Sequence, residues 1–370
     1  MSSPEVPSEF HGWCAVSKDS IEGKFVWQEY EPKAFADDDV DIRIMYCGVC
    51  ASDLHTASGG WGEVDYPQVV GHEIVGEVVR AGSEVKARQG RRHRRRGSAE
   101  RLVSRADRPQ YCDENLVGTY NGRYSREGPG KGPKSYGGYA DYHHAPSHFV
   151  VKIPDGLDHA IAAPMLCGGV TVYSPLVQYG AGKTAKDVGI VGIGGLGCVD
   201  HFGLLFAKAL GANVTAISHS ESKKADAEKM GATRFIATHS GSDDDFAPYK
   251  RSLDLIICTT NDASMPLIGY LSLLRPGGNL ILVGAPEGPV ARELPALPFL
   301  LGGVSLGGSA IGSPSTIKEM LELAAKQNIK SWIEKRPMED VNKLSSPAAS
   351  DWALCCRSYV LVNTKNGGKL

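Results

Sequence analysis

The sequence carries almost no net charge: its 370 residues include 40 lysines and arginines against 42 aspartates and glutamates, which leaves −2. A chain without an excess of one sign has no overall field that would attract nucleic acid or an anionic membrane surface. It also has no internal repeat, and its apolar residues make up 42% and its charged residues 22%. This composition is typical of a globular protein long enough for two domains, and it predicts neither a nucleic-acid nor a membrane partner.

No signal for export or membrane insertion is visible. The stretch from Met1 to Trp13 is polar and lacks a basic flank followed by an apolar run. Residues 160–181 form one long uncharged run, but its glycines, Pro164 and Pro175 are not typical of a transmembrane helix. The nine cysteines are an odd number scattered over a long chain, which argues against a disulfide framework. We expect reduced thiols, some of them metal ligands, in a cytoplasmic protein.

Two regions of different pattern divide the chain. The first 150 residues are rich in β-branched residues, glycine and proline, with short strands expected at 40–46 and 74–79. From about residue 185, helical stretches such as 202–210 and 222–230 alternate with apolar strands. Those strands are expected at 187–193, 213–218, 234–237, 253–258 and 279–283. The alternation predicts βαβ units and a parallel sheet, hence an α/β fold class.

A glycine-rich turn follows the first of these later strands. Residues 187–197 read Asp-Val-Gly-Ile-Val-Gly-Ile-Gly-Gly-Leu-Gly, which is G-x-G-G-x-G after a strand and before a helix. The glycines permit a tight turn and let backbone N–H groups approach a pyrophosphate at the helix N-terminus. We therefore predict a dinucleotide site that includes Gly192, Gly194, Gly195, Leu196 and Gly197.

The end of the next strand bears on the choice between NAD and NADP. A carboxylate about 20 residues after the glycines would bind the ribose 2′-hydroxyl, but none closes this strand. Instead Ser218, His219, Ser220 and Lys223 offer hydroxyl and cationic groups that suit a 2′-phosphate, although Glu221 is a discordant charge. NADP is the predicted cofactor; the alternative is an ordinary solvated helix start with a serine as its N-cap.

Three separated segments contain residues that bind metals. They read Cys-Gly-Val-Cys-Ala-Ser-Asp-Leu-His at 47–55, Gly-His-Glu-Ile-Val-Gly at 71–76 and Met-Leu-Cys-Gly-Gly at 165–169. Taken singly, a buried cysteine is usually a small apolar residue, and a histidine is usually on the surface or hydrogen-bonded. Together the segments supply cysteine, histidine and carboxylate groups, the ligand types of a catalytic zinc that keeps one position open for substrate.

The metal segments and the glycine turn resemble those of the zinc-containing medium-chain dehydrogenases, in their cinnamyl alcohol dehydrogenase branch, close to the fungal broad-specificity NADP-dependent alcohol dehydrogenases. The resemblance covers residues 40–87, 109–343 and 358–370. It implies a discontinuous, antiparallel, barrel-like (GroES-like) catalytic domain at 1–160 and 310–370. A Rossmann domain with a doubly wound parallel sheet would occupy 161–309. The implied activity is hydride transfer between NADP(H) and primary alcohols or aldehydes, cinnamyl-type or medium-chain aliphatic, in a homodimer.

The resemblance also implies a ligand set. Cys50, rather than Cys47, would bind the catalytic zinc together with His72 and Cys167. Glu73 would be a fourth ligand or a neighbour that exchanges with one.

The same resemblance implies further roles. Asp53 would orient His72 through its second ring nitrogen, Ser52 and His55 would relay a proton, and Trp61 is a candidate wall of the substrate pocket. The resemblance implies cofactor contacts for Thr171, Thr259, Val283, Gly284, Ala285, Ser309 and Ile311.

The family's second, structural zinc lacks its ligands here. Four closely spaced cysteines hold it in the family, and of these only Cys112 has a counterpart. The other three would fall in residues 88–108, which contain nine arginines in 21 residues. One cysteine cannot build a tetrahedral site, so we predict no structural zinc. The arginines have no interleaved aromatic residues or recognisable binding fold, so we do not expect a nucleic-acid site; a shifted reading frame is our preferred hypothesis.

Two further segments depart from the family. Residues 198–200 add three residues to the first turn of the helix after the glycines, which would rotate the rest of that helix by about 300°. Residues 344–357 replace an amphipathic helix, and Pro347 argues against a regular helix there. The alternative function is therefore an impaired or non-catalytic NADP-binding homologue. A zinc-free quinone or enone reductase is a third possibility, and metal content distinguishes it, because it needs no zinc ligands.

Overall fold

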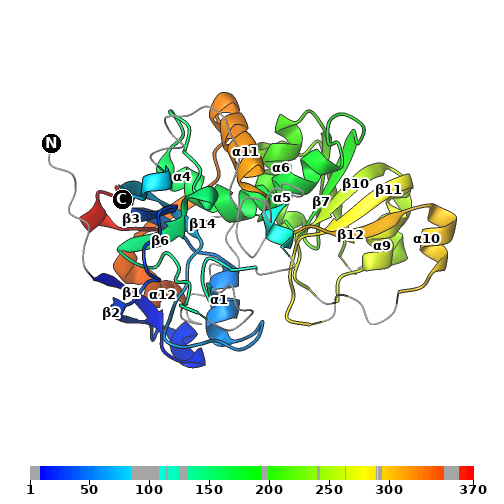
Figure 1. The fold of residues 1–370 in the computed structure, drawn as a ribbon. Coiled ribbons are helices and arrows are strands. Elements are labelled where there is room, and N and C mark those ends of the chain that lie inside the picture. Colours follow the sequence, from blue (N-terminus) through cyan, green and yellow to red (C-terminus); the bar gives the residue numbers. More distant parts are fainter. Residues whose placement is uncertain are drawn as a thin grey trace.

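The computed structural model describes residues 9–85, 108–112, 116–124, 132–193, 199–239, 242–262, 264–288, 290, 294–345 and 358–370. The predicted cofactor residues Gly194, Gly195, Leu196 and Gly197 lie outside these ranges, as do nearly all of the arginine-rich segment and most of residues 344–357. In the described part, a parallel sheet with its helices lies at one end of the molecule and two smaller, mainly antiparallel sheets lie at the other (Figure 1).

The parallel sheet has six strands in the order β12-β11-β10-β7-β8-β9. Their bounds are β7 (Asp187–Val191), β8 (Asn213–Ser218), β9 (Arg234–Ala237), β10 (Leu253–Cys258), β11 (Leu274–Leu282) and β12 (Ser305–Gly308). Every neighbouring pair is parallel. The first strand in sequence lies next to the middle of the sheet and the chain then builds outward on both sides, which is the Rossmann strand order. The predicted doubly wound α/β fold is confirmed.

These strands are apolar on both faces because helices cover both faces. Val188 and Ile190 of β7 pack into one cluster with helices α5 (Val170–Gln178), α6 (Val199–Ala209) and α11 (Pro314–Gln327). Val191 and Ile256 belong to a second cluster, which includes residues of α9 (Leu267–Ser272). Burial on two sides explains the unbroken apolar runs in the sequence. The remaining helices of this end are α7 (Lys224–Met230), α8 (Asp243–Phe246) and α10 (Leu297–Gly302).

The other end of the molecule combines strands from both ends of the chain. A three-stranded sheet has the order β2-β1-β4, and a five-stranded sheet has β13-β14-β3-β5 with β6 paired to β3. Their bounds are β1 (Phe10–Ala15), β2 (Val26–Tyr30), β3 (Asp39–Gly48), β4 (Gln68–Val69), β5 (Glu73–Ala81), β6 (Tyr142–Pro146), β13 (Ile333–Pro337) and β14 (Ser358–Val362). Strand β14 pairs antiparallel with β3, with Val360 opposite Gly48. A catalytic domain made from both chain ends accounts for this pairing, and its boundaries at 160 and 310 stay a prediction.

The long apolar run is helical and connects the two ends of the molecule. Helix α4 (His159–Pro164), a π-helical turn η4 (Met165–Gly169) and α5 follow one another without a break. This 20-residue segment is long and apolar enough to cross a membrane by length and composition alone, but 78% of its most apolar window is buried inside the protein. Such burial is typical of a core helix.

The added residues after the glycine turn are helical where they are described. Helix α6 begins at Val199, three residues before the predicted start, and the side chains of Asp200 and His201 are buried. Burial lowers the pKa of His201 to about 4, so its ring is neutral. Its ring packs edge-on against Trp332, with 4.9 Å between ring centroids. Val199 and Asp200 therefore extend the helix toward its N-terminus.

Candidate active site

Four potential metal ligands from three separate segments converge in the described structure. The ligand atoms of Cys50, His72, Glu73 and Cys167 all lie within 4.8 Å of one another. Cys50 stands before helix α1 (Ala51–Ser58), His72 and Glu73 stand at the start of β5, and Cys167 lies in the π-helical turn. Residues separated by more than 90 positions thus form one cluster, as the three sequence segments predict.

Cys50 is fixed by the way α1 begins. It is the N-cap residue with an extended backbone, and its N–H donates to Asp53 Oδ2 at 3.0 Å. A side chain three residues into a helix that accepts from the N-cap backbone closes a capping box. The cap therefore orients the Cys50 side chain and also places Asp53 beneath the site.

Asp53 is fully buried and joins three segments. Its Oδ1 accepts from Gly71 N at 3.0 Å and lies 2.8 Å from His72 Nδ1, and its Oδ2 accepts from the Tyr139 hydroxyl at 3.0 Å. Burial on its own raises the pKa of Asp53, but the charge and hydrogen bond of His72 hold that pKa below its ordinary value. With His72 Nδ1 directed at the carboxylate, Nε2 is the nitrogen left for a metal.

Glu73 places an unpaired oxygen in the cluster. Its side chain is buried, and Oε2 has no hydrogen-bond partner among the described residues. Burial raises the pKa of Glu73 well above its ordinary value. The side chain lies against Gly48, where a Cβ would overlap Oε2, so only glycine leaves room for it. A buried carboxylate oxygen without a partner is costly, and a cation would satisfy it.

The two cysteines of the cluster contact each other directly. A hydrogen bond between their thiols lowers the pKa of Cys50 well below its usual value and raises that of Cys167. A divalent cation could take the place of the shared proton. Cys47 takes no part, because its buried Sγ donates to the Gly48 carbonyl at 3.5 Å. Two sulfurs, one imidazole and one carboxylate fit zinc.

The proposed relay residues lie beside the cluster on one face of α1. Ser52 Oγ is 3.4 Å from Cys50 Sγ, and His55 follows three residues later, on the same side of the helix. The His55 ring stacks on Trp61, with 5.0 Å between centroids and 24° between planes. Its Nδ1 is 2.5 Å from Glu287 Oε1, a residue of the Rossmann domain that sequence reasoning missed.

The predicted cofactor residues that are described gather at one edge of the parallel sheet. One of them, Ser218, is the last residue of β8. The others come directly after the ends of β7, β10, β11 and β12, and they are Gly192, Thr259, Val283 and Ser309. The carboxyl ends of parallel strands meet at one edge, where dinucleotides bind in Rossmann folds. Gly284, Ala285 and Ile311 belong to the same loops, and Thr171 is buried in α5.

Gly192 shows why a glycine is needed at this edge. Its φ is +110°, a region that other residues rarely adopt. A Cβ there would come within 2.5 Å of Thr259 Oγ1, which donates to the Val191 carbonyl at 2.7 Å. Nearby, Ser309 Oγ and Asn261 Oδ1 are buried without a partner among the described residues. These unpaired groups fit a polar ligand at the strand ends.

The residues expected to bind a 2′-phosphate differ in their surroundings. The Ser218 side chain is buried and donates to the Ile193 carbonyl at 3.1 Å, so its hydroxyl is already used. Ser220 Oγ accepts from Ser222 N at 3.2 Å as a helix cap, which is the alternative that the sequence left open. The His219 side chain is exposed, and Lys223 lies in the same short turn.

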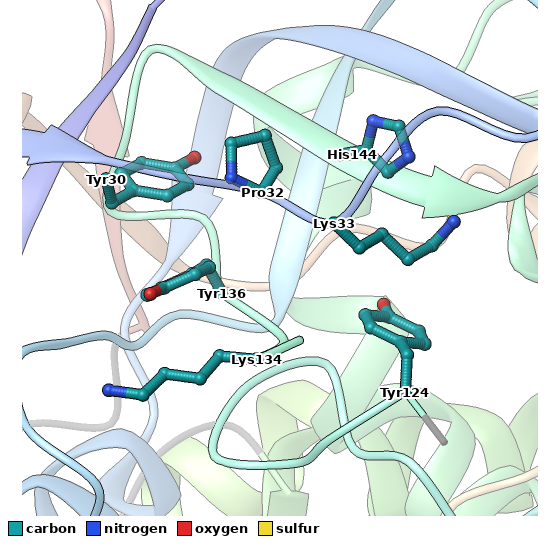
Figure 2. A pocket seen from close by; sticks show the side chains of 7 residues that line it. All are labelled: Tyr30, Pro32, Lys33, Tyr124, Lys134, Tyr136 and His144. Atoms are coloured by element: carbon teal, nitrogen blue, oxygen red, sulfur yellow. The ribbon is translucent and has the colours of Figure 1, made fainter. Parts of the chain in front are cut away.

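A separate small hollow lies in the catalytic domain, away from the cluster. It is lined by Tyr30, Pro32, Lys33, Tyr124, Lys134, Tyr136 and His144, and it has room for about one water (Figure 2). Lys33 pairs with Asp39 and Lys134 with Asp65. Because both cations already have partners and the space is so small, this hollow is not a substrate site.

Two tyrosine hydroxyls also hydrogen-bond to residues in or beside the cluster of metal ligands, and no sequence motif indicates them. Tyr139 donates to Asp53, and Tyr120 Oη lies 3.3 Å from His72 Nδ1. Their separations from these partners along the chain are 86 and 48 residues. A tyrosine in a β-rich region is usually a packing residue, so the sequence offers no signal that would have selected these two.

Comparison with known proteins identifies the family. Residues 36–155 match the alcohol dehydrogenase GroES-like domain, and residues 198–326 match the zinc-binding dehydrogenase domain. Cinnamyl alcohol dehydrogenase 2 of Rauvolfia serpentina is 40% identical over 348 residues, with 92% of each chain covered. NADP-dependent alcohol dehydrogenase 6 of Saccharomyces cerevisiae is 40% identical over 320 residues, with 84% of each chain covered.

A solved structure agrees with these relatives. A cinnamyl alcohol dehydrogenase of Sorghum bicolor superposes with a TM-score of 0.81 and 30% identity, covering 98% of this chain and 99% of that one. The matched domains include every residue of the metal cluster except Cys167, which the longer alignments span. The chain belongs to the zinc-dependent medium-chain alcohol dehydrogenases, in their cinnamyl alcohol dehydrogenase branch.

Proposed function

We propose that this protein is an NADP-dependent oxidoreductase that interconverts aldehydes and primary alcohols, with one zinc ion at the cluster of Cys50, His72, Glu73 and Cys167. The observation that carries the proposal is the convergence of those four ligand atoms within 4.8 Å. When bound, zinc would polarise the carbonyl oxygen as a Lewis acid while NADPH supplies the hydride. The relatives' names make cinnamyl-type aldehydes the first substrates to test.

The chain's own residues would hold the metal and move one proton. Cys50, His72 and Cys167 would hold the ion, and Glu73 would be a fourth ligand or a close neighbour of it. In aldehyde reduction, the product oxygen takes a proton from the Ser52 hydroxyl, which is replaced through His55. The 3.4 Å contact of Ser52 with Cys50 supports this role, because it places the hydroxyl beside the metal position.

The proposed cofactor is NADP(H), bound across the carboxyl edge of the parallel sheet. No carboxylate closes β8 to bind a ribose 2′-hydroxyl, and the exposed His219 together with Lys223 offers positive or polar groups for a 2′-phosphate. The yeast relative is named as NADP-dependent.

We further propose a cytoplasmic homodimer, in which β12, an edge strand of the described sheet, meets its counterpart in a second copy.

The test is NADPH oxidation with cinnamaldehyde and with hexanal, alongside zinc analysis of the same sample. Turnover with about one zinc per chain, lost in Cys50→Ser, is the expected outcome. Bound zinc and NADPH without turnover would favour the impaired homologue. Turnover without zinc would contradict the proposal, because a metal-free reductase does not need these ligands.

A further inference from the structure

A carboxylate of the Rossmann domain contacts the histidine of the proposed proton relay. Glu287 lies in the loop after β11, and His55 lies on α1 of the catalytic domain, 232 residues away along the chain. Glu287 Oε1 is 2.5 Å from His55 Nδ1, within hydrogen-bond distance. The contact therefore connects the two domains at the relay residue itself.

The loop between α1 and β4 leaves space for both partners. Trp61 stacks on one face of the His55 ring and so limits its rotation. At Gly60 a Cβ would overlap Glu287 Oε1, so the absence of a side chain there provides the position that the carboxylate occupies. Gly59, which ends α1 with φ +77°, begins this loop. The Glu287 carboxylate thus lies between the backbone of Gly60 and the imidazole of His55.

The pair is too exposed to matter much for folding. The side chains of His55 and Glu287 are 27% and 50% exposed, and ion pairs of such exposure contribute little to the stability of a protein. Its main effect is on orientation. An ionised carboxylate only accepts hydrogen bonds, so contact with Nδ1 makes that nitrogen the donor and leaves Nε2 to exchange a proton.

We propose that Glu287 is a positioning residue for the reaction: it holds His55 through Nδ1–H so that Nε2 can pass a proton toward Ser52. This inference rests on the proposed function, in which Ser52 and His55 carry the proton. For each aldehyde reduced, one proton leaves His55 Nε2 and one proton from solvent restores it. Glu287 neither gives nor takes a proton in this sequence, and no covalent bond to it forms or breaks.

The test is a double-mutant cycle in kcat for cinnamaldehyde reduction by the zinc-loaded protein, with Glu287→Gln, His55→Gln and the double variant. We expect Glu287→Gln to lower kcat about two- to fivefold, the range for losing a half-exposed charged contact, with an unchanged KM for NADPH. Added to His55→Gln, it should have no further effect. The solvent deuterium isotope effect on kcat should rise in Glu287→Gln, because a proton step has slowed.

Two companion variants separate position from charge. Gly60→Ala should reproduce the loss by displacing the carboxylate while keeping it in the protein. Glu77→Gln is the matched control, since Glu77 is also half-exposed (55%) and pairs at 2.6 Å with Arg43 away from the site. An equal fall of kcat in Glu77→Gln would overturn the proposal, as would an equal effect of Glu287→Gln with and without His55.

A readout independent of turnover is the ¹⁵N spectrum of the histidine rings, with His55→Gln identifying the signal. We expect a protonated Nδ1 in the wild type and a loss of this preference in Glu287→Gln; an unchanged signal overturns the proposal. A wild-type protein with the expected ring signal but no turnover would overturn the proposed function, and the relay role with it, while leaving the contact established.

Discussion

Asp53 links the potential metal ligands to the surrounding catalytic domain through hydrogen bonds. It accepts hydrogen bonds from the backbone of Cys50 and Gly71 and from the Tyr139 hydroxyl, and it faces His72 Nδ1. An amide at this position would keep the shape but lose the charge, and it could no longer accept at both atoms. The consequence should appear first in metal affinity, because the orientation of His72 depends on this carboxylate.

For Asp53→Asn we expect zinc to bind about 10–100-fold more weakly, the usual cost of removing a partner of a ligating histidine. Competition with a chelator of known affinity measures this. Asp141→Asn is the control, because Asp141 also accepts a backbone hydrogen bond, from His11 N at 3.0 Å, outside the cluster. Equal zinc affinity in Asp53→Asn and the wild type would contradict the role.

A second prediction separates the cysteines. Cys167→Ser should reduce the zinc content from about one per chain to near zero, because a hydroxyl is a poor substitute for a thiolate ligand. Cys47→Ser should keep its zinc, since the Cys47 side chain hydrogen-bonds to Gly48 outside the cluster. Elemental analysis after gel filtration measures both, and the reverse pattern would mean that the ligands are misassigned.

The metal ligands could be predicted from the sequence, but the residues that hydrogen-bond to the site residues could not. Cys50, His72 and Cys167 stand in short segments whose residue types suit a metal, so their convergence was expected. Glu287 and Tyr139 contact partners that lie far away along the chain. In the sequence, nothing distinguishes Glu287 from other glutamates or Tyr139 from other tyrosines. Only the fold reveals such partners, because no local spacing encodes them.

At the level of elements, strands β3 and β6 enclose a second group of charges. His144 lies opposite Asp41 in the ladder, with its Nδ1 2.7 Å from Asp41 Oδ1 and its Nε2 3.1 Å from Asp39 Oδ2. Both ring nitrogens face carboxylates, so the ring must donate twice and carries a charge. Burial lowers the pKa of His144, but the two carboxylates outweigh it and raise that pKa above its ordinary value.

This arrangement predicts a pH-dependent contribution to stability. Because the folded pKa of His144 is raised, the stabilisation is complete below the unfolded pKa of about 6.5 and is lost as pH rises through the folded value. His144→Asn should therefore cost about 1.5–3 kcal/mol at pH 6 and less at pH 9. Urea unfolding at both pH values measures it, and His159→Asn, at an exposed position, is the control. An equal cost at both pH values would contradict a charged ring.

The parallel sheet was easier to predict than the π-helical turn. Strands such as β8 and β10 are buried on both faces because helices cover them, so their residues are mainly apolar, with Thr215 and Asp254 among the exceptions. Helix α6 begins at Val199, three residues before the apolar stretch 202–210 that predicted it, and residues 198–200 were expected as additions to its first turn. In the turn Met165–Gly169 nothing in the residue types distinguishes a π-helix from an α-helix, so packing decides it.

At the level of the whole molecule, one end of the parallel sheet exposes apolar side chains. Beside the edge strand β12, helix α10 carries Leu297, Leu300 and Leu301 with 64%, 75% and 76% of their surfaces exposed. An open strand edge with exposed leucines is prone to pair with another copy. This is the surface on which the proposed homodimer depends.

Introducing charge there should separate the subunits. In sedimentation velocity we expect a dimer for the wild type and a monomer for Leu300→Lys combined with Leu301→Lys. Leu370→Lys is the control, because Leu370 is also well exposed (61%) but lies at the C-terminus, away from β12. A wild-type monomer, or a dimer that survives the double substitution, would show that this surface does not hold two copies together.

The helical segment from α4 to α5 has a mechanical consequence for the way the two domains can move. Ala160 and Ala163 at its start pack with Val360 of the catalytic domain, whereas Val172 and Leu176 at its end belong to the core of the Rossmann domain. Cys167 lies between them, at the irregular turn. If the two domains rotate relative to each other, this turn is the natural hinge, and atoms close to a hinge move least. The Cys167 sulfur would then stay close to Cys50 and His72, whereas the contact between His55 and Glu287, which joins the two domains, would open and close with the motion.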